Sequence, residues 1–175
     1  GFAIADNHQS YRKYTMMKDV CVSMKFGMSA EDIAKRRAEG FNSTFYVSCS
    51  THSPNTFTFS TAYESEFLIW YGEYRGYDGM LRWAWNSWPE DPVNDSRFGK
   101  FPSGDTYFGY PGGRVSIRYE MMRDGIEAAE KMRILSAEGH SEEVKAILDV
   151  IGEKEPDDPS FNMADAVPKA KEILN

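Results

Sequence analysis

Short apolar runs alternate with helical patterns along most of the chain. The runs 2–5, 20–24, 44–49 and 80–85 are short and rich in β-branched or aromatic residues, which is typical of buried strands. We predict helices over 8–17, over 30–39 behind the capping residue Ser29, from Ser60 to about 75, and over 115–137, 141–152 and 163–174. The order is βα four times, followed by two further helices.

Two of the predicted helices carry clear apolar faces. Between Ser60 and 75 the stripe is aromatic, and over 115–137 it is mixed. The stripe residues are Tyr63, Phe67, Tyr71 and Tyr74 in the first helix and Val115, Tyr119, Met122, Ile126 and Ala129 in the second. Stripes at this spacing predict core packing and not a cofactor site.

Strands that alternate with helices predict a parallel α/β sheet with right-handed crossovers. Four βα units are half of a (β/α)₈ TIM barrel, which typically needs about 250 residues. We therefore predict that 1–138 form the half barrel and that 139–175 form a helical C-terminal extension. In that fold every strand-to-helix loop opens on one face. The segments 6–8, 49–55 and 86–105 would meet there.

The longest of these loops follows the fourth strand and has an unusual composition. Trp83, Trp85 and Trp88 lie within six positions, and Pro, Asp, Asn, Ser and Gly dominate the rest up to Gly113. Loops of this length in a compact domain are usually functional or disordered. Aromatic faces beside short carboxylates and amides are typical of a sugar site. Core tryptophans at a strand end, followed by a solvated loop, explain the composition equally well.

Composition and charge exclude several classes of function. A formal charge of −7 argues against a nucleic-acid or anionic-membrane surface. No run approaches eighteen consecutive apolar residues, so no membrane span is predicted. Cys21 and Cys49 give no disulfide framework.

Two further kinds of site were weighed. Asp6 with His8, and Cys49 with His52, end two strands and are potential metal ligands, but the spacing is generic and these strands are not neighbours. We predict neither a metal nor a cofactor. The adjacent carboxylates in Pro-Glu-Asp-Pro (89–92) are poorly placed as an acid and nucleophile pair, and a role in stiffening the loop explains them better.

Three stretches carry a resemblance to a known family: WAWNSWPEDPVNDSRF (83–98), FPSGDTYFGYPG (101–112) and SIRYEMMRDGIEAAEKMRIL (116–135). They resemble the catalytic domain of glycoside hydrolase family 123, and the similarity runs from about residue 2 to 135. The resemblance implies a (β/α)₈ barrel that releases terminal β-linked N-acetylgalactosamine from glycans. It also implies a retaining, substrate-assisted mechanism, in which an Asp orients the substrate's acetamide and the adjacent Glu protonates the leaving oxygen.

The chain departs from the family pattern at the catalytic pair, because it contains no Asp-Glu dipeptide. No catalytic residue is therefore assigned here. The chain begins at Gly1 without Met, and we expect the pair to lie upstream, in a missing N-terminal half of the barrel. We expect the isolated fragment to be inactive.

The resemblance still assigns a wall of the sugar pocket. Trp83, Trp85, Asn86 and Trp88 match the family's aromatic signature, and the expected substrate-binding set also includes Asn7, His8, Tyr46, Asp105 and Tyr107. The Tyr46 hydroxyl either hydrogen-bonds the acetamide or belongs to the barrel core, which is slightly favoured. Arg97 is expected to pin the loop by pairing with Asp91 or Asp95.

The alternative from another class is a non-catalytic carbohydrate-binding module, which the same tryptophans would serve. The expected partners are a glycan and the missing half of the barrel. Because an isolated half barrel exposes sheet edges, we expect either that two copies pair as a homodimer or that the two tail helices cover the open side. Enzymes of this family are usually exported, so an extracytoplasmic location is expected.

Overall fold

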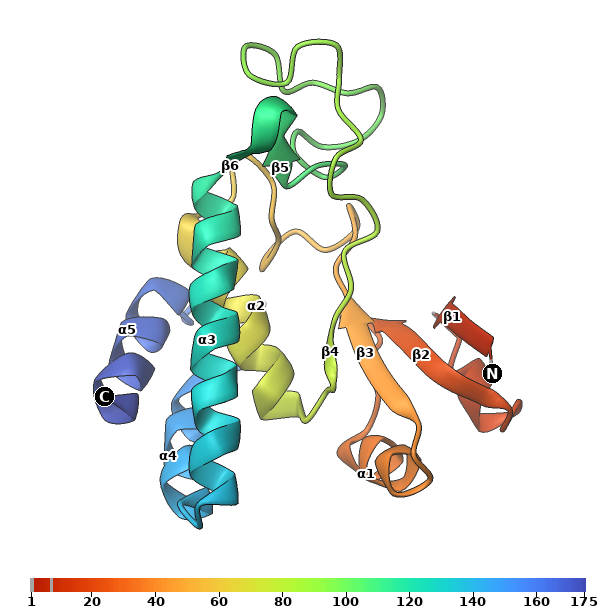
Figure 1. The fold of residues 1–175 in the computed structure, drawn as a ribbon, viewed down its shortest axis with the longest axis vertical. Helices are drawn as coiled ribbons and strands as arrows, with labels where there is room; N and C mark the ends of the chain where they lie inside the picture. Colours follow the sequence, from red (N-terminus) through yellow and green to blue (C-terminus); the bar gives the residue numbers. More distant parts are fainter. Residues whose placement is uncertain (1, 7) are drawn as a thin grey trace.

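A four-stranded parallel sheet forms one side of the fold, and its parallel strands were predicted (Figure 1). The computed structural model describes residues 2–6 and 8–175. The strands are β1 (Phe2–Asp6), β2 (Met17–Ser23), β3 (Asn42–Tyr46) and β4 (Gly79–Met80), in the order β1-β2-β3-β4. The helices are α1 (Ala30–Ala38), α2 (Ala62–Arg75), α3 (Ile117–Ala137), α4 (Ser141–Ile151) and α5 (Met163–Leu174). Two short 3₁₀ turns, η1 (Ser10–Arg12) and η2 (Pro111–Gly113), and a hairpin of β5 (Gly109–Tyr110) and β6 (Arg114–Val115) complete the description.

The sheet buries one face against helices. On β2 and β3, Val20, Val22 and Phe45 are almost fully buried and share a core with residues of α1 and α2. Residues alternate between the two faces of a strand. Thr44 and Tyr46 therefore belong to the opposite face, which no helix of the described chain covers in Figure 1.

A buried arginine ties α1 to the amino-terminal edge of the sheet. Arg36 donates to the carbonyls of Met17, Lys18 and Asn42 at 2.9–3.0 Å, and its Nε donates to Ser43 Oγ. Burial lowers the pKa of Arg36, and nearby acidic groups oppose that shift. The guanidinium thus satisfies carbonyls that precede or begin two strands, where the sheet ladder leaves them unpaired.

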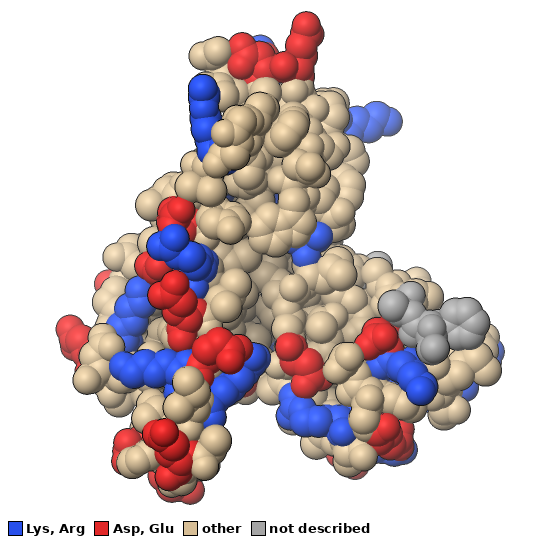
Figure 2. All heavy atoms as spheres, viewed as in Figure 1, with Lys and Arg blue, Asp and Glu red and all other residues tan. Residues whose placement is uncertain are grey.

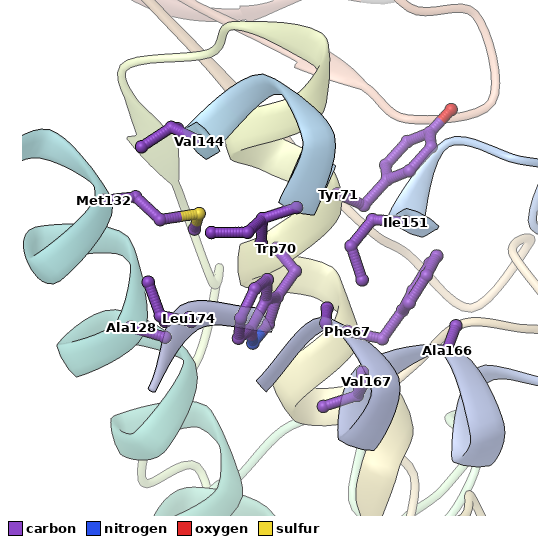
Figure 3. Packing of buried hydrophobic residues seen from close by; sticks show 12 residues of the cluster. Phe67, Trp70, Tyr71, Ala128, Met132, Val144, Ile151, Ala166, Val167 and Leu174 are labelled. Atoms are coloured by element: carbon purple, nitrogen blue, oxygen red, sulfur yellow. The ribbon is translucent and has the colours of Figure 1, made fainter. Parts of the chain in front are cut away.

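A second core joins the tail helices to α2 and α3 (Figure 3). Trp70 and Phe67 of α2 are fully buried, and α4 and α5 contribute Ile151 and Val167. The aromatic stripe predicted on α2 is therefore core at Phe67 and Tyr71, although Tyr74 at its end is 39% exposed. The helices of 139–175 pack on the α/β unit and do not form a separate layer away from it.

Two predicted elements are wrong at the ends of strands. The helix expected over 8–17 is only the single turn η1, because the Asp6 carboxylate accepts from the backbone N–H groups of His8 and Ser10 and directs the chain into a tight turn. The strand expected over 80–85 ends at Met80. There the side chain of Arg82 turns into the interior to reach Asp105.

The predicted face of α3 is also partly wrong. The helix begins at Ile117 behind the cap Ser116, so Val115 lies in β6 and is 51% exposed. Met122 and Ala129 are buried as expected, but Ile126 is 48% exposed. Gly125 packs directly on α2, where an added Cβ would lie 3.0 Å from the Glu66 carbonyl oxygen. This close approach defines the side of α3 that faces α2 and leaves Ile126 outside it.

The remaining helix predictions are confirmed within a residue or two. Ser29 caps α1 by accepting from Asp32 N at 3.1 Å, and Asn162 caps α5 through Ala164 N. His140 is exposed at the start of α4, as expected. In the part of the chain that the structure describes, no helix is long and apolar enough to cross a membrane.

A buried carboxylate provides a test of how the tail is held. Glu66 on α2 is fully buried, accepts from Trp70 Nε1 and pairs with Lys171 of α5 at 2.6 Å. Lys171→Ala should lower the free energy of unfolding by about 1–3 kcal/mol, because it leaves a buried carboxylate without its partner, although the lysine is partly solvated. Urea denaturation measures the loss. Lys169→Ala, an exposed lysine on the same helix, is the matched control, and an equal effect of both variants would refute this role for Lys171.

Candidate functional site

The loop after β4 is long but well organised at its base. Residues 85–88 run back alongside 106–109, and Asn86 and Tyr107 form an antiparallel bridge. Phe108 N donates to the Trp85 carbonyl at 2.9 Å, and Thr106 Oγ1 donates to the Ser87 carbonyl at 2.6 Å. The intervening residues project beyond the carboxyl ends of the strands (Figure 1). The loop is therefore closed on itself like a hairpin and is not a loose connection.

Two buried arginines fasten this base to the rest of the fold. Arg82 donates to the carbonyl of Val47, at the end of β3, and to both the carbonyl and carboxylate of Asp105. Arg118, on the first turn of α3, donates to the carbonyls of Thr56, Gly104 and Tyr107. Three segments far apart in sequence thus converge on two guanidinium groups.

This anchor buries more positive than negative charge. Arg82 and Arg118 are both more than 90% buried, and within residues 2–6 and 8–175 only the Asp105 carboxylate pairs directly with either of them. Burial lowers the pKa of each arginine, while Asp105 opposes that shift at Arg82 and Tyr110 opposes it at Arg118. The Arg118 guanidinium also lies 5.3 Å from the ring centroid of Phe108, so aromatic faces share in stabilising the charge.

Glycine is required where the loop meets Arg118. Gly104 has φ +84°, and an added Cβ would lie 2.8 Å from both Arg118 Nη1 and Thr58 N. A side chain at this position would therefore strain the backbone and also clash with the anchor. Because Gly104 has no side chain, the Asp105 carboxylate and the carbonyls of Gly104 and Asp105 can approach the two arginines together.

Four half-exposed rings gather on the loop, and we call Trp83, Trp85, Trp88 and Phe101 the aromatic patch. Their exposed fractions lie between 38% and 49%. Trp83 and Phe101 lie 5.2 Å apart between ring centroids, Trp85 packs edge-on against Phe108, and Trp88 Nε1 donates to the Gly109 carbonyl at 2.8 Å. Each tryptophan is held on one side and open on the other, as in a preorganised binding surface.

The predicted sugar-site residues divide into two groups. Asn86 is exposed beside Trp85, whereas Asp105 and Tyr107 are at most 1% exposed and belong to the anchor beneath the patch. A direct contact of Asp105 with a sugar, as expected from sequence, would compete with its bond to Arg82. In this structure Asp105 and Tyr107 therefore support the base of the loop.

The remaining predicted residues lie at the ends of other strands. Tyr46 is half-buried on the helix-free face of β3, and His8 is exposed after β1. Asn7 lies outside the described residues. Because all four strands are parallel, these positions share the edge of the sheet above which the long loop lies (Figure 1).

The acidic residues of the loop serve its internal structure. The Asp91 carboxylate accepts from Asn94 N and Asn94 Nδ2, and these hydrogen bonds lower its pKa. Arg97 pairs with Asp95, as predicted, and its hydrogen bonds lower the pKa of Asp95 to about 2. Among the described residues, no group of three His, Cys, Asp or Glu side chains is placed to hold a metal ion. The site thus offers ring faces, an amide and hydroxyls for binding.

Sequence reasoning missed three members of this site. Arg82 and Arg118 lie in apolar or amphipathic stretches without a motif that marks them, and Phe101 belongs to a loop segment of mixed composition. A charged residue between Leu81 and Trp83 in an otherwise apolar run was the signal for Arg82. An arginine in such a run needs a buried partner.

Comparison with known proteins identifies the class and then the family. The model of the glycoside hydrolase 123 catalytic domain matches residues 1–135. The class is therefore that of the glycoside hydrolases. More narrowly, the chain belongs to glycoside hydrolase family 123, as the resemblance in the sequence predicted.

The fold comparison extends over the whole chain. A family 123 glycoside hydrolase from Clostridium perfringens, described in a structural analysis of glycolipid glycan hydrolysis, superposes with a TM-score of 0.81 at 21% identity. The match covers 98% of this chain and 34% of that one, so the chain spans about a third of the neighbour's length. No curated protein matches the chain.

The anchor can be tested against an exposed ion pair of the same loop. Asp105→Asn should lower the free energy of unfolding by about 3–5 kcal/mol, because it leaves the buried Arg82 without a counter-charge. Asp95→Asn removes the half-exposed partner of the solvent-exposed Arg97 and should leave stability unchanged within error. Chemical denaturation of the two variants measures the difference. Equal effects would contradict the anchoring role.

Proposed function

We propose that this chain is part of a retaining, substrate-assisted exo-glycosidase that releases β-linked N-acetylgalactosamine from glycans. In this proposal the chain supplies the aromatic wall of the sugar pocket and not the catalytic carboxylates. The observation that carries it is the aromatic patch, three half-open tryptophans held rigidly beside Asn86, in a member of a glycoside hydrolase family. Rigid ring faces suit the C–H faces of a sugar, and an amide suits its hydroxyls.

The absence of a suitable carboxylate pair in the sequence supports this division of labour. No Asp-Glu dipeptide occurs, and of the neighbouring acids 90–91 the Asp91 carboxylate is engaged in closing a turn. In a substrate-assisted mechanism the acetamide oxygen of the sugar attacks the anomeric carbon. The protein then needs one carboxylate to orient the acetamide and one acid for the leaving oxygen. We propose that both lie in another part of the catalytic domain.

The architecture of that domain follows from the same proposal. Four parallel strands, three of them followed by an α-helix, with both sheet edges unpaired among the described residues, are what we would expect of half of a (β/α)₈ barrel. The coverage of only a third of the neighbour's chain supports a longer catalytic domain. The helix-free face of the sheet, with Tyr46, would then line the barrel interior.

A non-catalytic carbohydrate-binding module is the second candidate, because the aromatic patch alone would bind a sugar. It predicts that the complete protein binds glycans and lacks turnover. The glycosidase proposal predicts turnover that requires an Asp-Glu pair outside these residues.

The division of labour predicts that residues 1–175 alone do not hydrolyse an aryl β-N-acetylgalactosaminide. General acid catalysis is typically worth about 10²–10⁴-fold, and the acetamide-orienting carboxylate would be missing as well. Release of the aryl alcohol, followed by absorbance against a buffer control, measures this. Turnover by the chain alone would refute the division and return attention to Glu90 and Asp91.

The aromatic patch predicts a loss of substrate use when Trp83 is truncated in the complete enzyme. Trp83 is 49% exposed and packs on Phe101, so Trp83→Ala should change the melting temperature little. Loss of a stacking ring should cost about 1–3 kcal/mol in transition-state binding, or roughly 5- to 150-fold in kcat/KM.

The matched control for Trp83 is Tyr14→Ala. Tyr14 is also an exposed ring, at 46%, but it precedes β2 at the opposite edge of the sheet. Tyr14→Ala should therefore leave kcat/KM unchanged. If Trp83→Ala mainly unfolds the protein, or if both variants have equal kinetics, the patch is not the sugar subsite.

A further inference from the structure

A cavity separate from the aromatic patch lies beside the β5–β6 hairpin, at the amino end of α3 (Figure 1). Its volume is about 400 Å³, within the range of about 300–1,000 Å³ that is usual for small-molecule sites. None of the four rings of the patch lines it. Its polar lining comes from the loop before α2, the hairpin and the start of α3, and consists of Arg114, Arg118, Thr58, Ser60, Tyr110 and Ser116.

The cavity is positively charged although the chain is acidic. The chain has a formal charge of −7, yet the described residues that line the cavity include two arginines and no Asp or Glu. Asp91 and Asp95 flank the lining residue Val93 in sequence, but their carboxylates are engaged by Asn94 and Arg97. On the face shown in Figure 2, acidic side chains lie along α3 and at the tip of the long loop, and the surface between them shows none. A cavity with this charge favours an anion.

Arg118 contributes a buried charge without a counter-charge. It is 3% exposed, and its hydrogen bonds go to three main-chain carbonyls. In the part of the chain that the structure describes, no carboxylate pairs with it, because Asp105 pairs with Arg82. Burial and the nearby charge of Arg118 both lower the pKa of Arg82. A buried cation that is held by neutral acceptors alone is incompletely compensated, so an anion in the cavity would stabilise it.

Arg114 brings an unengaged guanidinium group to the same cavity. Gly112 and Gly113 adopt φ +77° and +73°, which allows the chain to reverse between β5 and β6. The reversal sets Arg114 opposite Tyr110 in the hairpin. The Arg114 side chain is exposed and makes no hydrogen bond or ion pair with the described residues. Its planar fork is therefore free to bind a carboxylate or a sulfate through two parallel hydrogen bonds.

The remaining lining of the cavity is aliphatic and exposed. Val93, Val115 and Ile117 are 54%, 51% and 63% exposed. A free inorganic ion would leave these side chains in water, whereas the C–H groups of an acidic sugar would cover them. The hairpin also joins the cavity to the aromatic patch, because Trp88 Nε1 donates to the Gly109 carbonyl and Gly109 pairs with Val115. A glycan that stacks on Trp88 can therefore extend across the hairpin toward the arginines.

We propose that this cavity, the arginine pocket, binds an acidic sugar whose carboxylate or sulfate ester faces Arg114. Val115 and Ile117 contact the C–H groups of the sugar, and the buried charge of Arg118 attracts the anion. The inference rests on the proposed function in one respect, because it takes the anion to belong to a glycan. It adds the class of substrate, which is a glycan with an acidic residue close to the N-acetylgalactosamine that is released.

Binding of matched acidic and neutral sugars to the complete protein tests this assignment. The first pair is the methyl glycoside of N-acetylneuraminic acid and its uncharged methyl ester. Galactose sulfate and galactose form the second pair, and inorganic sulfate is the arm without a sugar. We expect each acidic sugar to bind at least roughly tenfold more tightly than its neutral counterpart in isothermal titration calorimetry, because hydrogen bonds to ionised groups are the stronger ones.

Arg114→Gln separates the arginine pocket from the overall charge of the protein. Because the Arg114 side chain is exposed and unengaged, the melting temperature of this variant should not change. Its affinity for the acidic sugars should fall roughly 10- to 100-fold, while its affinity for the neutral counterparts is the internal reference. Arg123→Gln is the matched control, since it removes the same charge from a 56% exposed arginine of α3 that does not line the cavity. It should leave all affinities unchanged.

Four outcomes would overturn the inference. Equal binding of the acidic and neutral sugars would show that the pocket does not recognise charge. Inorganic sulfate that binds as tightly as the acidic sugars would reduce it to a site for a free anion. Equal losses in Arg114→Gln and Arg123→Gln would assign the effect to overall charge. Arg114-dependent binding to phosphatidylserine vesicles that acidic sugars do not displace would assign the surface to a membrane.

These measurements do not depend on hydrolysis, so the two proposals can fail separately. Turnover of a neutral aryl β-N-acetylgalactosaminide without any preference for acidic sugars in binding would refute the arginine pocket alone. Arg114-dependent binding of acidic sugars by a complete protein without turnover would refute the glycosidase proposal alone.

Discussion

Two buried guanidinium groups hold the candidate site together. Arg82 lies two residues after the end of β4 at Met80, and Arg118 lies in the first turn of α3. Between them the chain makes its longest excursion from the sheet. Where it returns, the carbonyls of Gly104, Asp105 and Tyr107 and the Asp105 carboxylate accept hydrogen bonds from these two side chains. A guanidinium has five donors and cannot be neutralised at ordinary pH. Its burial therefore requires that many acceptors converge on it, which specifies the conformation of the loop base.

This anchor explains why the rings of the aromatic patch stay exposed to solvent. A tryptophan in a solvated loop would normally collapse onto the nearest apolar surface. Here Arg82, Asp105 and Tyr107 are buried at the base of the loop, while the rings of Trp83 and Trp85 are 49% and 44% exposed. The buried polar layer thus keeps apolar faces in contact with solvent, which is the arrangement that a sugar pocket requires.

The elements that could be predicted from sequence are those specified by local signals. Ser29 and Asn162 cap their helices, and the helices lie where the caps and the apolar spacing place them. The wrong predictions arose where a tertiary contact overrode a local pattern. The Asp6 carboxylate accepts a hydrogen bond from the backbone N–H of His8, so the chain turns where a helix was predicted. Arg82 lies in an apolar run that predicts a strand, but its side chain turns inward to bind Asp105.

The site was predictable in part for the same reason. Three tryptophans within six positions identify the aromatic patch, because no pairing with distant residues is needed to recognise them. Asp105 and Tyr107 were placed among sugar ligands, since their chemistry fits and the sequence does not show that Arg82 and Arg118 surround them. A polar residue in a loop can face a ligand or a buried cation, and only the three-dimensional position of the cation distinguishes the two.

The two cores differ in how completely they are covered, and this difference links the fold to its use. The core formed by α2, α3, α4 and α5 is closed around Trp70 and Ile151, which are fully buried. The core between the sheet and its helices is open at β4, where Ile126 is 48% exposed and Arg82 Nε has no acceptor among the residues that the structure describes. The tail helices pack on the side of α2 and α3 away from this opening, as Figure 1 shows, and so do not cover it. A chain with one closed core can hold α2 and α3 in place while the strand edge beside them stays available.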